Sequence, residues 1–166
     1  MGIIFLDIDG VLNSRLYYES PRYDYNKDSV DPLERKLSDI DPKSIEFLND
    51  LIEKTGAKVV ITSTWRRYYT IVELSELFKK RGFVGEILDK TPTCGSDCLR
   101  GNEILRWVKE NETLIGRHYH EFNDYVILDD DSDMLYWQRN NFIVVDGYVG
   151  LTPNICYKAE RVLKRG

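Results

Sequence analysis

Four short apolar segments punctuate the chain, and each is followed directly by polar or charged residues. They cover residues 3–6, 58–61, 125–128 and 142–145 and are rich in β-branched and aromatic side chains. Such runs are typical of β-strands. Because they are continuously apolar and do not alternate, they predict strands of a parallel sheet that is covered on both faces.

Amphipathic segments lie between these strands and predict helices. Asp41-Pro42 is a typical helix start, with Asp as N-cap and Pro in the first turn, and Gly56 marks the end of that helix. The other predicted helices cover residues 71–80, 103–109, 134–139 and 153–163. Among their side chains, Trp107 and Trp137 are predicted to belong to the core.

The alternation of strands and helices predicts an α/β fold, a doubly wound parallel sheet with helices on both faces. The chain of 166 residues fits a single domain, and no second domain boundary is visible. In such sheets ligands bind beyond the carboxyl ends of the strands. Functional side chains are therefore expected directly after each apolar strand.

Residues 13–39 interrupt the alternation. This segment is longer than an ordinary connection and contains Tyr17, Tyr18, Tyr23 and Tyr25. We expect it to form a small flap over the site, in place of a large cap domain. A disordered surface loop is the alternative.

The first strand ends in Asp7-Ile8-Asp9-Gly10. An extended chain places Asp7 and Asp9 on the same side, where the two carboxylates repel each other unless a cation or a proton intervenes. A divalent cation with oxygen ligands, Mg²⁺ above all, meets this need, and Gly10 allows a close turn around a ligand. The alternative is a solvated Asp-Gly turn whose carboxylates cap backbone amides.

Hydroxyl and basic side chains follow the second strand, at Thr62, Ser63 and Arg66. Either hydroxyl is suited to donate a hydrogen bond to a phosphoryl oxygen, and Arg66 to bind a phosphate through two bonds. The hydroxyls are equally suited to cap the helix that follows. The pattern alone leaves both interpretations open.

A dense group of carboxylates follows the third of the four strands, at Asp129, Asp130, Asp131 and Asp133. Such a group is costly without a cation. A calcium-binding EF-hand loop is excluded, because Met134 stands where that loop requires glycine and no glutamate closes it. One or both of Asp131 and Asp133 are expected to cap the next helix.

Arg100 stands near the start of a predicted helix, where the helix dipole disfavours a cation. Binding an anion would account for it there. Lys90 is the competing cation, and the sequence favours Arg100 without excluding Lys90.

Together these motifs describe a site for a metal ion and a phosphate, and their order resembles the haloacid dehalogenase (HAD) superfamily. DIDGVL at 7–12 resembles its first signature, Thr62 the second, Arg100 or Lys90 the third, and Asp129-Asp130 the fourth. ITSTWR at 61–66 and RGNEI at 100–104 further resemble the small HAD domains of nucleic-acid repair proteins, like the 3′-phosphatase half of polynucleotide kinase.

The resemblance implies a magnesium-dependent phosphomonoester hydrolase. Asp7 would attack the phosphorus and form an aspartyl-phosphate, and Asp9 would protonate the leaving oxygen and then activate water. Mg²⁺ would be held by Asp7, the backbone carbonyl of Asp9 and Asp130, with Asp129 in support. Arg100 would stabilise the charge on the phosphoryl oxygens. The second aspartate, Asp9, distinguishes phosphatases of this superfamily from dehalogenases.

The chain has no room for the large cap domain of many HAD proteins, so the site is expected to be lightly covered. Such a site suits a nucleic-acid end or a phosphoprotein, while a nucleotide or another phosphomonoester stays open as the substrate. Two other function classes remain: a non-catalytic HAD-like module that binds phosphate or a protein, and a phosphotransferase with the same nucleophile. Retention of Asp7 and Asp9 argues against the binding module, which needs no general acid.

Charge and composition narrow the partners. The net charge of −5 means that the surface as a whole repels nucleic acid, so such a substrate is compatible with the sequence but not required by it. No apolar run reaches the roughly 18–20 residues of a membrane helix, and the start lacks a signal-peptide pattern. Three cysteines suit a reducing compartment, with Cys94 and Cys98 expected as unpaired thiols. A cytoplasmic location without a membrane partner is therefore expected.

Overall fold

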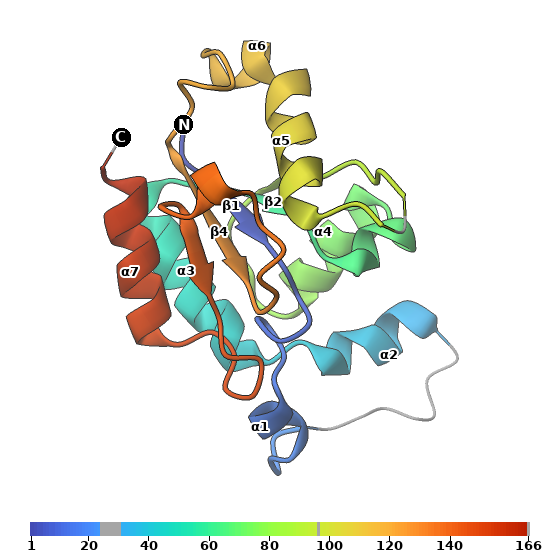
Figure 1. The fold of residues 1–166 in the computed structure, drawn as a ribbon. Helices are drawn as coiled ribbons and strands as arrows, with labels where there is room; N and C mark the ends of the chain where they lie inside the picture. The colour runs from blue at the N-terminus through green and yellow to red at the C-terminus, as the bar shows by residue number, and fades with distance from the viewer. Residues whose placement is uncertain (24–30, 96, 166) are drawn as a thin grey trace.

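The computed structural model describes residues 1–23, 31–95 and 97–165. Within them a single parallel sheet has the strand order β3-β2-β1-β4-β5 (Figure 1). The strands are β1 (Ile3–Leu6), β2 (Lys58–Ile61), β3 (Ile87–Lys90), β4 (Tyr125–Asp129) and β5 (Phe142–Val144). The chain extends the sheet first to one side of β1 and then to the other, which confirms the predicted doubly wound sheet.

Helices cover both faces of this sheet, as the sequence predicts. The α-helices are α1 (Arg15–Tyr18), α2 (Pro32–Asp39), α3 (Pro42–Thr55), α4 (Ile71–Lys80), α5 (Arg100–Glu110), α6 (Glu112–Ile115) and α7 (Pro153–Leu163). Side chains alternate along β1, so Ile4 and Leu6 belong to one apolar core with α3, α4 and α7. Ile3 and Phe5 belong to a second core with Trp107 of α5. Both cores are buried, and together they hold β1 rigidly in the centre.

Strand register brings the ends of three strands to the same level. Leu6 of β1 lies opposite Ile61 of β2 and Leu128 of β4. The residues that directly follow these three are Asp7, Thr62 and Asp129. The register alone gathers these three side chains at the carboxyl edge of the sheet.

Strand β3 was not predicted, and its burial explains why. Ile87 is buried, whereas Leu88, Asp89 and Lys90 are half-buried, because β3 is the outermost strand on its side. A strand at the sheet edge does not need a continuous apolar run. Its sequence therefore lacks the signal that identified β1, β2 and β4.

The helix predicted over residues 134–139 is wrong, since this stretch contains only the 3₁₀ helix η2 (Tyr136–Gln138). Asp133 does not cap the segment that follows it. Its carboxylate instead accepts a hydrogen bond of 2.7 Å from the backbone N–H of Arg100, the first residue of the distant helix α5. Leu135 is extended and packs closely over Gly101. Trp137 is consequently 62% exposed, which corrects its predicted place in the core.

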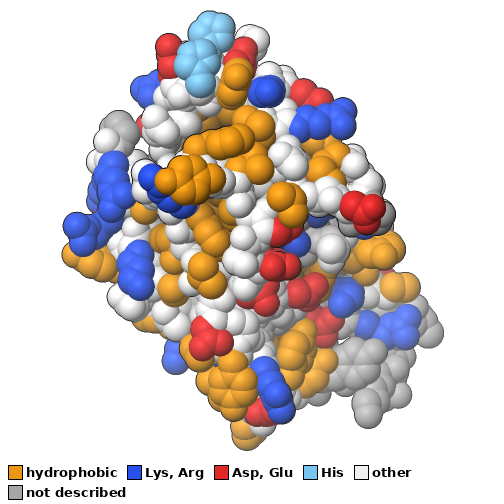
Figure 2. Space-filling model, in the orientation of Figure 1, with side chains coloured by type: hydrophobic (Ala, Val, Ile, Leu, Met, Phe, Trp, Pro, Cys, Tyr) orange, Lys and Arg blue, Asp and Glu red, His pale blue; other side chains and the backbone are white. Residues whose placement is uncertain are grey.

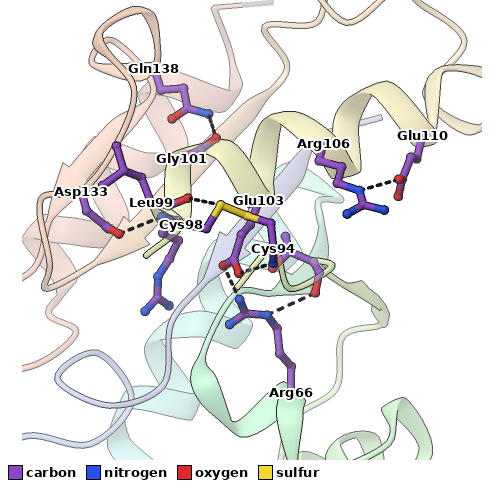
Figure 3. Close-up of a disulfide and its surroundings, with 12 residues drawn as sticks. Arg66, Cys94, Cys98, Leu99, Gly101, Glu103, Arg106, Glu110, Asp133 and Gln138 are labelled. Atoms are coloured by element: carbon purple, nitrogen blue, oxygen red, sulfur yellow. Dashed lines mark hydrogen bonds and ion pairs between the residues drawn. A yellow bond between two sulfur atoms is a disulfide. The ribbon is translucent and has the colours of Figure 1, made fainter. Parts of the chain in front are cut away.

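The loop that leads into α5 differs from expectation at its cysteines. Cys94 and Cys98 form a disulfide, with their Cα atoms 5.6 Å apart, where unpaired thiols were expected (Figure 3). That separation is ordinary for a disulfide. Cys156 is a buried free thiol. The three cysteines are therefore one disulfide between neighbouring positions and one unpaired thiol.

The predicted flap, residues 13–39, is described only in part, and residues 24–30 with Tyr25 lie outside the described residues. Its described ends, with α1 and α2, lie beyond the carboxyl ends of the strands (Figure 1). The Tyr17 hydroxyl donates a 2.8 Å hydrogen bond to the carbonyl of Ser38, and Arg22 pairs with Asp41 at 2.8 Å. A covering role for the segment stays a prediction. In the described part of the chain, no helix is long and apolar enough to cross a bilayer.

Candidate active site

Asp7, directly after β1, is the central carboxylate of the candidate site. It is 4% exposed, and its Oδ1 accepts a hydrogen bond of 2.6 Å from Nη1 of Arg100. Burial raises the pKa of Asp7 to about 6; Arg100 opposes this rise, while Asp9 and Asp130 add to it. A buried carboxylate that one arginine only partly neutralises still favours a further cation.

Two more carboxylates reach the same place from the end of β4. One carboxylate oxygen from each of Asp7, Asp129 and Asp130 lies within 4.8 Å of the others. Asp129 is fully buried, its Oδ2 is 3.3 Å from Nε of Arg100, and burial together with the charge of Asp7 raises its pKa to about 7. That Oδ2 accepts no hydrogen bond from the described residues. An all-oxygen donor set with excess negative charge fits a hard divalent cation.

Glycines on two loops make room for Asp130. Gly10 has a φ of +77°, and a Cβ added there would overlap the carboxylate of Asp130. A Cβ on Gly147 would lie 2.7 Å from the same Oδ2. The turn after β1 therefore requires glycine both for its backbone conformation and for the close approach of this carboxylate. In Figure 2 acidic side chains gather on this face of the molecule.

Asp9 is exposed and is held by two side-chain donors. Nδ2 of Asn13 donates to its Oδ1 at 2.8 Å, and Nε1 of Trp65 donates to its Oδ2 at 2.9 Å. Oδ1 of Asn13 in turn accepts from the N–H of Gly10 at 2.8 Å. Lys36 of α2 lies over the Trp65 ring, 4.5 Å from its centroid. Asp9 is thus oriented beside Asp7 while its carboxylate stays open to a substrate.

The two hydroxyls after β2 have different surroundings. Ser63 caps the 3₁₀ helix η1 (Thr64–Arg67), its Oγ accepting from the N–H of Trp65 at 3.4 Å. The Oγ1 of Thr62 is buried and has no hydrogen-bond partner among the described residues. The Thr62 carbonyl accepts a hydrogen bond of 2.9 Å from Nη1 of Arg100. Of the two, Thr62 is therefore the hydroxyl without any hydrogen-bond partner among the described residues, whereas Ser63 is engaged as an acceptor.

Arg66, predicted to bind phosphate, points elsewhere. It is 4% exposed and forms a buried ion pair with Glu103 of α5 (Figure 3). Its guanidinium also donates to the carbonyl oxygens of Thr62 and Thr91. Because these three acceptors hold its guanidinium, Arg66 is not directed at Asp7.

The two competing cations are also separated. Nζ of Lys90 donates to the carbonyls of Arg66 at 2.8 Å and Tyr69 at 2.9 Å. Arg100 instead contacts both Asp7 and Asp129 from the first turn of α5. Arg100 is therefore the cation at the carboxylates, whereas Lys90 is held by the carbonyl oxygens of Arg66 and Tyr69.

Sequence reasoning missed Asn13 and Gly147 as parts of this site. Asn13 lies three positions after Gly10, a spacing at which an Asn side chain commonly bonds to a turn amide, so a local signal existed. Gly147 follows Asp146 in an ordinary turn and carries no signal of its own. Its role depends on a contact between distant parts of the chain.

A doubly wound sheet with an aspartate pair after its first strand, further aspartates after β4 and an arginine between them defines a HAD-type domain. The chain belongs to one family within that class, the HAD domain in Swiss Army Knife RNA repair proteins, whose model matches residues 3–155. No curated protein and no solved structure matches the chain. Membership of this family supports a hydrolase of the phosphatase type and a phosphorylated nucleic-acid substrate.

Proposed function

We propose that the protein is a magnesium-dependent phosphomonoester hydrolase that acts on phosphorylated nucleic-acid ends through an aspartyl-phosphate. The observation that carries this proposal is the contact of 2.6 Å between Arg100 and Asp7, within a cluster of three carboxylates. A binding module would need the cation to attract phosphate, but it would not need a buried carboxylate against that cation.

Asp7 is the nucleophile in this mechanism. Its carboxylate is held in one orientation by its place after β1 and by the hydrogen bond from Arg100, which supports its use as an attacking group. The attack forms a bond between the carboxylate oxygen and phosphorus, and the bond to the leaving oxygen breaks. Arg100 and the hydroxyl of Thr62 donate to the phosphoryl oxygens, where negative charge is concentrated.

Asp9 serves as general acid and then as general base. Asn13 and Trp65 hold its two oxygens, which orients the carboxyl group toward the leaving oxygen. It gives its proton to that oxygen in the first step. In the second step it takes a proton from the water that hydrolyses the aspartyl-phosphate.

The metal site consists of Asp7, Asp130 and the backbone carbonyl of Asp9, with Asp129 in support. All donors are oxygens, which is the set that Mg²⁺ prefers. The bound ion would neutralise charge on the transferring phosphoryl group.

The test is phosphate release by wild type beside Asp7→Asn, with Mg²⁺ and with excess chelator. The substrates are an aryl phosphate, nucleotides, and oligonucleotides phosphorylated at the 3′ or the 5′ end. We expect wild type to release phosphate from an oligonucleotide, and Asp7→Asn to lose at least about a thousandfold in kcat, as nucleophile replacements do. Full activity of the folded variant, or activity undiminished by chelator, would contradict the proposal.

A further inference from the structure

A basic recess adjoins the candidate active site, where the loops after β2 and β3 meet. Its volume is about 600 Å³, and Arg66, Arg67, Lys90 and Thr91 are among its lining residues. Both loops leave the carboxyl ends of their strands, so the recess opens at the same edge of the sheet as Asp7.

Two of the three cations that line this recess form no ion pair in the described part of the chain. Glu103 pairs with Arg66, whereas Glu73, which accepts two hydrogen bonds from Thr70, acts on Lys90 through its charge without forming an ion pair. Neither the exposed Arg67 nor Lys90 has a carboxylate within ion-pair distance among the described residues. Lys90 also keeps one unused donor, since an ammonium has three N–H groups and only two carbonyls accept from it.

A buried hydroxyl adds a second, independent sign of a ligand. Thr91 is 2% exposed and lines the recess, and its Oγ1 has no hydrogen-bond partner in the described part of the chain. Buried polar groups are nearly always hydrogen-bonded, so an unpartnered hydroxyl in a recess with two cations that form no ion pair indicates a missing acceptor. A phosphate oxygen is an acceptor of that kind.

Arg66, one of the residues that line the recess, is linked to Asp7 by a short series of hydrogen bonds. Arg66 and Arg100 both donate to the carbonyl oxygen of Thr62, and Arg100 donates to Asp7. Asp7 is thus separated from the guanidinium of Arg66 by three hydrogen bonds in series, a span of at most about 9 Å. The recess that Arg66 helps to line is therefore a neighbour of the candidate active site.

We propose that this recess binds an internal phosphodiester of a polynucleotide whose terminal phosphate is at Asp7, with Arg67 and Lys90 as its cations and Thr91 as a donor. The inference rests on the proposed function, and it names the feature by which the protein would prefer a polynucleotide to a nucleoside monophosphate. A polynucleotide presents a second phosphate near its end, whereas a nucleoside monophosphate has none. Local positive charge at this place also offsets the net charge of −5, which otherwise repels such a substrate.

The test compares two substrates on Arg67→Ala, an exposed position outside the catalytic group. For a single-stranded 3′-phosphorylated oligonucleotide we expect KM to rise roughly tenfold at low salt with kcat unchanged, the effect of losing one charge-assisted hydrogen bond. For a nucleoside 3′-monophosphate we expect no change. The slope of log KM against log salt should fall by about 0.7 for the oligonucleotide. Arg67→Lys should retain most of the affinity, and Lys158→Ala, on the exposed surface of α7, is the matched control.

Equal effects of Arg67→Ala on both substrates, or none on either, would overturn the inference. A larger effect on a doubly phosphorylated peptide than on the oligonucleotide would overturn its polynucleotide identity. Binding of an oligonucleotide without terminal phosphate to Asp7→Asn separates the two proposals. If that binding depends on Arg67 although wild type never releases phosphate, the proposed phosphodiester site is supported and the proposed hydrolase activity is contradicted. If phosphate is released but binding does not depend on Arg67, the hydrolase activity is supported and the phosphodiester site is contradicted.

Discussion

Two arginines, the buried Arg66 and the half-buried Arg100, donate to the carbonyl oxygen of Thr62, yet their surroundings differ. Arg66 is matched by one carboxylate, Glu103, and by backbone carbonyls, so its charge is balanced. Arg100 contacts Asp7 and Asp129, in a cluster that also includes Asp130. The charge of Arg66 is thus balanced by one buried carboxylate, whereas the cluster around Arg100 carries surplus negative charge. That surplus is what this cluster needs to bind a cation and to attack phosphorus.

The largest expected effect comes from breaking the balanced pair. Glu103→Gln leaves the charge of Arg66 buried without its partner, so we expect the free energy of unfolding to fall by about 3–5 kcal/mol. Urea denaturation measures this change. The matched control is Glu110→Gln, in the exposed pair with Arg106, which should change stability little. A stability loss no larger than in this control would show that the Arg66 pair does not carry the role assigned to it.

Removing the other arginine should lower kcat, and its effect on the fold is measured separately. Arg100→Met deletes the donor to Asp7 and to the transferring phosphoryl group, so kcat should fall by about 10²–10³, as for other lost charge-stabilising donors. Steady-state kinetics with thermal melting as a folding check would measure it. Near-normal kcat in the folded variant would mean that the two arginines do not differ in function.

A smaller effect is expected where the orientation of Asp9 depends on Trp65. Trp65→Phe keeps an aromatic ring but removes the N–H that donates to Asp9 at 2.9 Å. We expect kcat to fall roughly tenfold with little change in KM, the cost of one hydrogen bond to a charged group. Tyr69→Phe, which alters a neighbouring ring without touching Asp9, is the control. An unchanged kcat and pH profile in Trp65→Phe would exclude this positioning role.

The smallest effect is a pH dependence of stability in the metal-free protein. Burial raises the pKa of Asp7 to about 6 and of Asp129 to about 7, from 3.8. Between about pH 4 and 7 the folded state then binds more protons than the unfolded state, so stability falls as pH rises through this window. Calorimetry in chelator should show Tm falling over that range, and Mg²⁺ should raise Tm more at pH 8 than at pH 5. A flat profile, or an equal Mg²⁺ effect at both values, would contradict the assignment of surplus charge.

The central strands and their chemistry were predictable from the sequence because their signals are local. β1 is apolar and buried throughout, and so are the last three residues of β2, so the bounds of both strands were predicted correctly. The parallel sheet then fixes that Asp7, Thr62 and Asp129 meet, since adjacent parallel strands end at the same edge.

What the sequence could not reveal depends on contacts between distant segments. Arg66 and Glu103 are 37 positions apart, and nothing near Arg66 indicates that its charge is already neutralised. Asp89, a polar residue whose presence in β3 kept that strand from being predicted, accepts a hydrogen bond of 2.7 Å from Trp107. The sequence thus identified the charged residues at the strand ends, and only the fold separated the structural arginine from the one at the carboxylates.

The measurement that tests the central claim most directly is detection of the covalent intermediate. Asp9→Asn should form the aspartyl-phosphate from an aryl phosphate, whose leaving oxygen needs no general acid, but should release it slowly because the general base is gone. After acid quenching of a reaction with Mg²⁺ and this aryl phosphate, peptide mass spectrometry should find one phosphoryl group on Asp7. The same treatment of Asp7→Asn should find none. Turnover by wild type together with a phosphoryl group on another residue, or with full activity of Asp7→Asn, would contradict the account.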